Sequence, residues 1–328
     1  MHTKAASILF LGFLFAFIRV SGQDAVFSQF YANPVYLNPA LAGNVICPRI
    51  ALNYRNQYPA LGGNYVTYNA AADMYVNSLS GGMAVLATSD KTGPLGSFSG
   101  DIVYSYHLRI TEKLRMSAAL QAGYYQYRLN WDKLVFEDMI NPGTGEIISG
   151  SEAQPDKLTV GDIDFSTGMV LGYDQKYYVG FAAHHITNPD LAFYQGNISR
   201  LATRFTIHAG AIFNLKDALA GRENDNFSLS PNIVYMQQGD FHQLNGGMYL
   251  NFYPFVTGLW LRHNFENPDA VIAMLGFQQP TFKVGYSFDF TLSHMGMPAG
   301  GAHEISFVWY LPCPQKDFQY KAIKCPSF

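Results

Sequence analysis

The feature that most constrains this chain is an alternation of apolar and polar residues with a period of two, repeated in segments of about ten residues. In the segment 282–290, Phe, Val and Tyr occupy every second position, and Lys283, Gly285, Ser287 and Asp289 lie between them. Residues 98–110 repeat this pattern. Because successive side chains of a strand point to opposite faces, each run predicts a strand with one apolar and one polar face.

Breaks at Gly, Pro and Asn divide these runs into about fourteen candidate strands. A soluble β-sandwich is the alternative, but its strands are shorter and it carries more charge. Long strands in even number favour an all-β, transmembrane, antiparallel outer-membrane β-barrel. The expected strands lie near 49–55, 64–76, 81–89, 97–110, 114–129, 164–173, 177–187, 204–215, 227–237, 241–252, 255–264, 270–278, 281–293 and 302–311.

The composition supports a surface that faces lipid. Charged residues make up 14% of the chain and aromatic residues 15%, whereas ordinary soluble domains carry about 25% charged residues. The formal net charge of −3 argues against nucleic acid as a partner. We therefore expect outer-membrane lipid around the barrel.

The first residues predict export. An apolar run from Ile8 to Ile18 is ended by Arg19, and small residues precede Gln23. A run this short is typical of a secretory signal peptide, here 1–22 with cleavage near Gly22/Gln23. A retained membrane anchor is the alternative.

The connections predict the orientation of the barrel. With a periplasmic N-terminus, odd-numbered connections lie outside, and the two longest, 130–163 and 188–203, are both odd. Most even connections are tight turns, with 216–226 as the exception. Within the longest outer loop, we expect cargo contact at Asn141, Pro142, Gly143, Thr144 and Gly145.

Strand parity places a set of charged side chains in the lumen. Mixed signs predict internal ion pairs, which either brace a narrow interior or line a solute pathway. The set is Arg55, Asp101, His107, Arg109, Arg115, Arg262, Lys283, Asp289 and Glu304.

No catalytic or metal-binding pattern stands out. The pairs His184-His185 and His303-Glu304 cannot converge on one ion by themselves, because neighbours in a strand point to opposite faces. The chain is predicted to be no enzyme and to hold no cofactor or metal.

The three cysteines allow one pairing across the barrel seam. Cys47 precedes the first strand and Cys313 follows the last, and these strands are neighbours in a closed barrel. A disulfide between Cys47 and Cys313 is one hypothesis; Cys313–Cys325 and three free thiols are the others.

The segment 23–46 is apolar and aromatic, yet Asn33-Pro34 and Asn38-Pro39 interrupt regular structure. We expect an irregular periplasmic plug or docking segment at the inner mouth of the barrel. Pro312 and Pro314 end the last strand, so 312–328 is expected to be a periplasmic tail after a barrel spanning 47–311.

Three stretches, "FSQFYANPVYLNPALAG", "YSFDFTLSHMGMPAGGAHEISFVWYL" and "KCPSF", together resemble the PorP/SprF family. Its N-terminal motif matches Phe27, Gln29, Phe30, Tyr31, Asn33, Pro34, Leu37, Asn38, Pro39 and Gly43. Its C-terminal motif matches Gly300, Gly301, His303 and Glu304.

The resemblance implies an outer-membrane barrel of the Bacteroidetes type IX secretion system. It implies partners of two kinds: a secreted adhesin or type B cargo C-terminal domain, and periplasmic type IX secretion or gliding subunits. A docking barrel for protein secretion, gliding motility or a cell surface adhesin is the function expected. A passive outer-membrane channel or solute transporter is the alternative, and bilayer conductance would separate the two.

Overall fold

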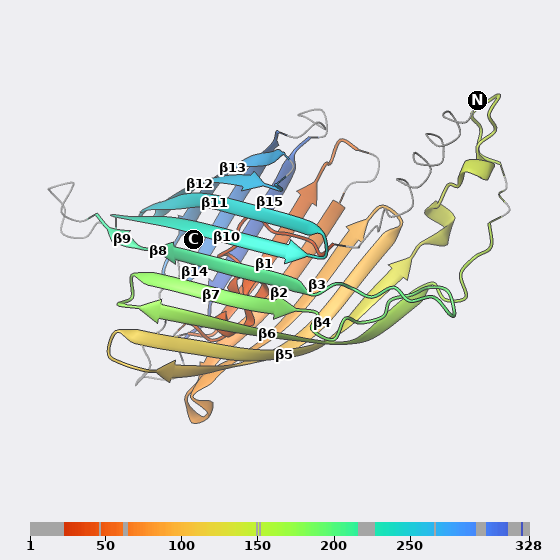
Figure 1. Cartoon of the computed structure of the whole chain (residues 1–328). Coiled ribbons are helices and arrows are strands. Elements are labelled where there is room, and N and C mark those ends of the chain that lie inside the picture. The colour runs from red at the N-terminus through yellow and green to blue at the C-terminus, as the bar shows by residue number, and fades with distance from the viewer. Residues whose placement is uncertain are drawn as a thin grey trace, which may run out of the picture.

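The strands of this protein form one closed antiparallel barrel (Figure 1). The computed structural model describes residues 23–45, 47–61, 65–148, 150, 152–215, 227–265, 267–292, 300–313 and 323. The expected signal peptide, Cys325 and most of the expected tail lie outside these residues. The strands are β1 (Arg49–Gln57), β2 (Tyr65–Val76), β3 (Gly81–Thr92), β4 (Leu95–Arg109), β5 (Leu114–Leu129), β6 (Thr159–Tyr173), β7 (Tyr177–His184), β8 (Arg204–Ala211), β9 (Phe213–Asn214), β10 (Phe227–Gln238), β11 (Phe241–Phe252), β12 (Phe255–His263), β13 (Pro268–Gln278), β14 (Phe282–Thr291) and β15 (Ala302–Tyr310).

Closure comes from the pairing of β1 with β15 and of β10 with β11. Strands β8 and β9 both pair with β10 and are two parts of one strand. The barrel therefore has fourteen strand positions, which confirms the expected count and fold class.

The largest boundary error concerns β6, which begins at Thr159 rather than near residue 164. Residues 159–163 read Thr-Val-Gly-Asp-Ile, and this short mixture hides the alternation. Pairing with β5, from Tyr124↔Ile163 to Arg128↔Thr159, extends the strand. Long-range hydrogen bonds thus decide the boundary where the local pattern is weak.

Burial along the strands follows the predicted parity. In β14, Lys283, Ser287 and Asp289 are buried, whereas Tyr286 and Phe290 are exposed. Polar residues inside and apolar residues outside are the arrangement of a barrel surrounded by lipid. Arg109, the last residue of β4, is exposed.

The two ends of the barrel differ in their connections. Residues 130–158 join β5 to β6 and residues 185–203 join β7 to β8 at one end, which we call the long-loop end. The opposite, short-turn end carries the β6–β7 and β11–β12 turns. Figure 1 shows the β5–β6 connection, in yellow-green, projecting far beyond the barrel. Among the described residues, no helix has the length and apolar character needed to cross a membrane.

The N-terminal segment 23–45 occupies the interior of the barrel (Figure 1, red). It contains the short helix α2 (Pro34–Leu37) and the 3-10 turn η1 (Pro39–Leu41). Pro34 and Pro39 each start one of these turns, where their missing N–H costs nothing. Most side chains from Phe27 to Ala42 are buried, and they form the centre of the main apolar core.

Candidate functional site

The N-terminal segment traverses the whole lumen, and its contacts lie at successive depths. At the long-loop end, the Asp24 carboxylate contacts Arg204 at 3.0 Å. At the short-turn end, the Gly43 N–H donates to Asp73 Oδ2 at 2.8 Å. The segment expected as a plug or docking segment at the inner mouth thus has contacts at both ends of the barrel. Its polar groups find partners along the full height of the wall, so the segment extends through the barrel.

The two sequence motifs meet inside the lumen. The N–H groups of Ser28 and Gln29 donate to the two carboxylate oxygens of Glu304, at 2.6 and 3.0 Å. The Gln29 side-chain amide donates to the Glu304 backbone oxygen at 3.0 Å. Gln29 and Glu304 are both fully buried. Glu304 thus holds the segment through charge-assisted hydrogen bonds.

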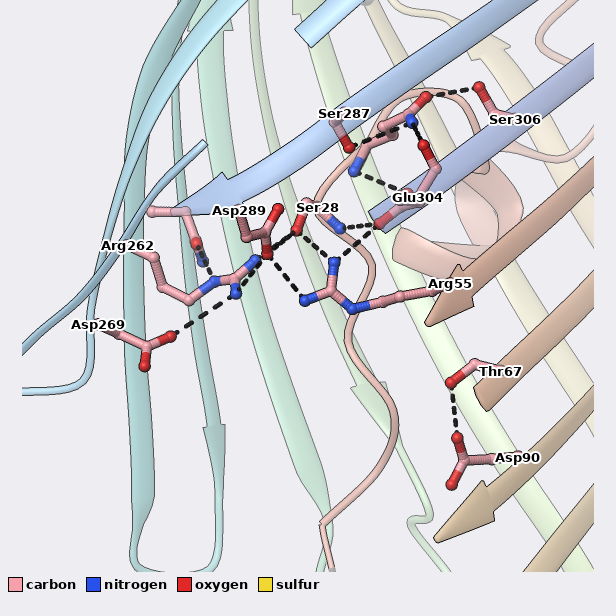
Figure 2. A network of polar contacts seen from close by, with 12 residues as sticks. Ser28, Arg55, Thr67, Asp90, Arg262, Asp269, Ser287, Asp289, Glu304 and Ser306 are labelled. Atoms are coloured by element: carbon pink, nitrogen blue, oxygen red, sulfur yellow. Dashed lines mark hydrogen bonds and ion pairs between the residues drawn. The ribbon is translucent and has the colours of Figure 1, made fainter. Parts of the chain in front are cut away.

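Two buried arginines balance Glu304 and Asp289 (Figure 2). Arg55 contacts Asp289 at 2.8 Å and Glu304 at 3.1 Å, and Arg262 contacts Asp289 at 2.9 Å. The Ser28 hydroxyl donates to Asp289 at 2.7 Å and accepts from Arg55 at 2.6 Å. Because buried charges are tolerated only when they are paired, we interpret this network as a brace. It joins the segment to four strands.

Below this brace, aromatic side chains of the segment pack against the wall. The Tyr31 ring lies edge-on to Tyr178 and Tyr249, at centroid distances of 6.0 and 6.2 Å. Phe30 packs against Trp260 at 5.3 Å. Deeper still, the Asn38 amide lies 3.0 Å from His208 Nε2. The middle of the lumen is therefore filled by packed side chains.

At the long-loop end, His185 lies between two carboxylates. Its ring nitrogens lie 2.8 Å from Asp24 and 2.8 Å from Asp164. Burial alone lowers the pKa of His185, but the two carboxylates outweigh it and raise that pKa to about 9. Burial would raise the pKa of Asp24, yet His185 and Arg204 hold it below its usual range. The start of the segment is thus fixed by opposite charges.

At the short-turn end, the segment approaches the wall closely. A Cβ on Gly82 would overlap the Ala42 carbonyl, and Gly43 has a positive φ of 65°. The chain then leads to Cys47, which forms a disulfide with Cys313 in this structure, with a Cα–Cα distance of 4.6 Å. Of the pairings left open by the sequence, this one closes the barrel seam.

The tail is represented by one described residue beyond Cys313. Ile323 is buried in the main core at the short-turn end. Its carbonyl accepts a hydrogen bond of 2.7 Å from the Asn44 side chain. This residue therefore contacts the end of the N-terminal segment.

A cavity of about 550 Å³ opens above the brace at the long-loop end. We call it the vestibule. The first residues of the segment, Gln23–Val26, line it together with Tyr58, Tyr65, Asp90, Phe241, Arg262 and Asp269, among others. The packed segment lies beneath it, so the vestibule ends blindly inside the barrel.

The remaining sequence-predicted residues are separate from the lumen brace. His303 lies beside Tyr286 Oη, at 2.9 Å, on the face of β15 opposite Glu304. Gly300 and Gly301 precede β15 with positive φ values of 86° and 61°. The described residues contain no group of three or more His, Cys, Asp or Glu side chains suited to a metal ion.

The predicted contact loop forms a small ordered hairpin. The Asn141 side chain accepts the Gly143 N–H at 2.9 Å, and Ile140 forms a bridge with Ile147. Residues 142–145 are exposed. The loop projects from the long-loop end, away from the brace.

Sequence reasoning did not identify Asp24, Ser28, His185 or Arg204 as part of the site. Parity correctly placed Arg55, Arg262, Asp289 and Glu304 inside. A signal for Ser28 existed, since it stands inside the N-terminal motif. The contacts of Asp24 depend on how far the N-terminal segment extends along the barrel axis, and no local sequence pattern predicts that distance.

Comparison with known proteins points to one family. Residues 20–309 match the model of the family described as "Type IX secretion system membrane protein PorP/SprF". No curated protein matches the chain.

Among solved structures, the chain is similar to the CymD monoaromatic hydrocarbon channel, with 14% identity, a TM-score of 0.47, and coverage of 88% of this chain and 95% of the other. It is also similar to the outer membrane protein Omp33 of Acinetobacter baumannii. That match has 8% identity, a TM-score of 0.44, and coverage of 82% and 100%.

Proposed function

Because the chain belongs to the PorP/SprF family of type IX secretion system membrane proteins, we propose that this outer-membrane barrel docks a secreted protein. The partner is a surface adhesin or a type B cargo C-terminal domain, held at the long-loop end. The short-turn end faces periplasmic secretion or gliding subunits. The family and fold are those of a secretion-system barrel and of no enzyme class.

The observation that carries this proposal is the filled lumen. The segment 23–45 is hydrogen-bonded at both ends of the barrel and packed in between. A barrel filled in this way offers its two ends, rather than a continuous pore, for interaction. Binding at an end is therefore the activity that this architecture supports best.

The β5–β6 connection supports docking at the long-loop end. Val135, Ile140, Ile147 and Ile148 are large apolar residues that are exposed on this connection. Exposed apolar side chains grouped beyond the barrel are typical of protein interaction sites. We assign cargo contact to residues 141–145 and to these neighbouring side chains.

At the short-turn end, we assign the tail 312–328 to contact with periplasmic subunits. The remaining parts are a leader, 1–22, removed near Gln23, the lumen segment 23–46, and the barrel 47–311. Buried Ile323 supports a tail that is anchored to the barrel end.

Co-purification tests the docking proposal. The full-length protein, extracted from outer membranes in mild detergent, is expected to carry a secreted protein identified by mass spectrometry. A variant lacking residues 141–150 is expected to lose it. A variant with Lys113→Ala in the short-turn end should retain it. Retention of the same partner by the deletion variant at normal surface levels would contradict the assignment of the loop.

Conductance tests the channel alternative. The purified protein is expected to show no steady ohmic conductance in a planar bilayer, since the lumen is occupied. A steady ohmic pore in the intact protein would favour the passive channel or solute transporter instead.

A further inference from the structure

The vestibule has the size of a binding site. Its volume of about 550 Å³ lies within the range of about 300–1,000 Å³ that is common for ligand sites. Its lining residues lie above the brace, at the long-loop end of the barrel. A ligand that enters would reach the first residues of the segment.

The wall of the vestibule carries an unbalanced carboxylate. Asp90 accepts a hydrogen bond of 2.6 Å from the hydroxyl of Thr67 (Figure 2) and one of 3.1 Å from the hydroxyl of Thr92. Neither partner is charged, and among the described residues no cation forms an ion pair with Asp90. Its side chain is half-buried, so the charge is accessible from the cavity.

A second carboxylate, Asp269, lies across the cavity. Its contact with Arg262 is long, at 3.6 Å, and its side chain is 22% exposed. Arg262 also forms a shorter ion pair with Asp289, at 2.9 Å, so its positive charge is balanced mainly within the brace. Asp24, which also lines the vestibule, has an unpartnered Oδ1 although its side chain is only 6% exposed.

Aromatic rings complete the vestibule. The rings of Tyr58 and Tyr65 meet edge-to-face at 6.0 Å, and Phe241 lines another part of the cavity. Aromatic faces attract cations and pack against the aliphatic stems of lysine and arginine. Carboxylates beside aromatic rings therefore match a long cationic side chain.

The projecting connection strengthens this preference. Residues 130–158 contain six acidic and two basic residues, a net charge of −4. Negative charge at the long-loop end raises the local concentration of a positively charged partner.

We propose that the vestibule is a peptide site for a lysine or arginine side chain presented by the docked partner. This inference rests on the proposed docking function and specifies the chemistry of the partner. The aliphatic stem packs on the rings of Tyr58 and Tyr65, and the cationic head pairs with Asp90, while Asp269 adds a second negative charge on the wall of the same cavity.

Peptide binding to the full-length protein in detergent tests the proposal. The probes are two fluorescein-labelled, end-capped hexapeptides of Gly and Ser, one with two lysines and one with two glutamates. Fluorescence anisotropy is expected to show binding of the lysine peptide at least about 10-fold tighter than the glutamate peptide. The double variant Asp90→Asn/Asp269→Asn should lose about 10-fold or more.

The controls separate charge in the vestibule from charge elsewhere. Asp132→Asn removes a carboxylate on the projecting connection and should change the affinity less than 3-fold. The single variant Asp90→Glu, which keeps the negative charge and leaves Asp269 unchanged, should retain most of the affinity for the lysine peptide. Heat-modified mobility on gels verifies that each variant is folded. Tyr65→Ala, an exposed substitution at the rim, tests the aromatic contact and should lower the affinity for the lysine peptide by about 3-fold or more.

Equal affinity for the lysine and glutamate peptides, or no binding of either peptide, would overturn the proposal. Displacement of the lysine peptide by the neutral sugar maltotriose as effectively as by unlabelled lysine peptide would overturn it as well. Failure of the peptide test with intact co-purification of a secreted partner refutes this site alone. Failure of both the peptide binding and the co-purification of a secreted partner refutes the docking function as well.

Discussion

Gln29 and Glu304 are 275 residues apart in the chain, yet the Gln29 N–H donates to the Glu304 carboxylate at 3.0 Å inside the barrel. Each belongs to one of the two sequence motifs that resemble the PorP/SprF family. The N-terminal motif supplies a segment for the lumen, and the C-terminal motif supplies its anchor.

The anchor predicts the effect of Glu304→Gln. The substitution leaves Arg55 with one carboxylate fewer and weakens the acceptor for Ser28 and Gln29, so the free energy of unfolding should fall by about 3–5 kcal/mol. Urea unfolding, followed by tryptophan fluorescence from buried Trp260, measures it. Glu146→Gln, on the exposed hairpin, should stay within about 0.5 kcal/mol. Equal stability of the two variants would contradict the brace.

A close approach of two backbones predicts that Gly82→Ala is costly. A methyl group there would overlap the Ala42 carbonyl, and overpacking of this kind typically costs about 1–3 kcal/mol. Limited proteolysis should show a released N-terminal segment. Gly246→Ala is the matched control, because a Cβ there meets no atom within 4 Å. If both variants resist protease like the wild type, the segment is not held as described.

The pKa of His185 predicts a pH-dependent anchor at the long-loop end. A pKa raised to about 9 from an ordinary value of about 6.5 means that protonated His185 stabilises the fold. That contribution is complete below about pH 6.5 and is lost as the pH rises through about 9. Histidine-selective NMR in detergent micelles should show one ring titrating near 9, absent in His185→Gln. Titration of that ring near 6.5 would argue against the Asp24 contact.

The path of the segment predicts which face of the membrane its start reaches. Ala25 lines the vestibule at the long-loop end, and longer loops of bacterial barrels face the exterior. In a Cys325→Ser background, Ala25→Cys should react with a membrane-impermeant maleimide on intact cells. Glu112→Cys, in the β4–β5 turn, should react only after lysis. The opposite labelling pattern would place the segment in the reverse direction.

The disulfide predicts a stability that depends on reductant. Cys47 and Cys313 are separated by 266 residues, and loss of a native disulfide commonly costs about 2–5 kcal/mol. Dithiothreitol should lower the urea midpoint of the wild type and leave that of Cys313→Ser unchanged. Non-reducing peptide mapping should recover the cross-linked pair. A midpoint insensitive to reductant in the wild type would count against this bridge.

Much of the fold was predictable because strand parity is a local property. Each alternating run records which face meets lipid, so the positions of Arg55, Asp289 and Glu304 inside the barrel followed from their neighbours alone. Weak alternation at 159–163 hid the start of β6, and only its pairing with β5 defines that boundary.

The sequence by itself determined the barrel, its strand number, and which charged residues turn inward, because these depend on a period of two along the chain. Only the tertiary structure decided how far the N-terminal segment rises and which residues receive it. The contacts of Asp24 with His185 and Arg204, and of Gln29 with Glu304, join distant parts of the chain. They depend on the closed wall bringing those side chains together around one interior, and no local pattern encodes that meeting.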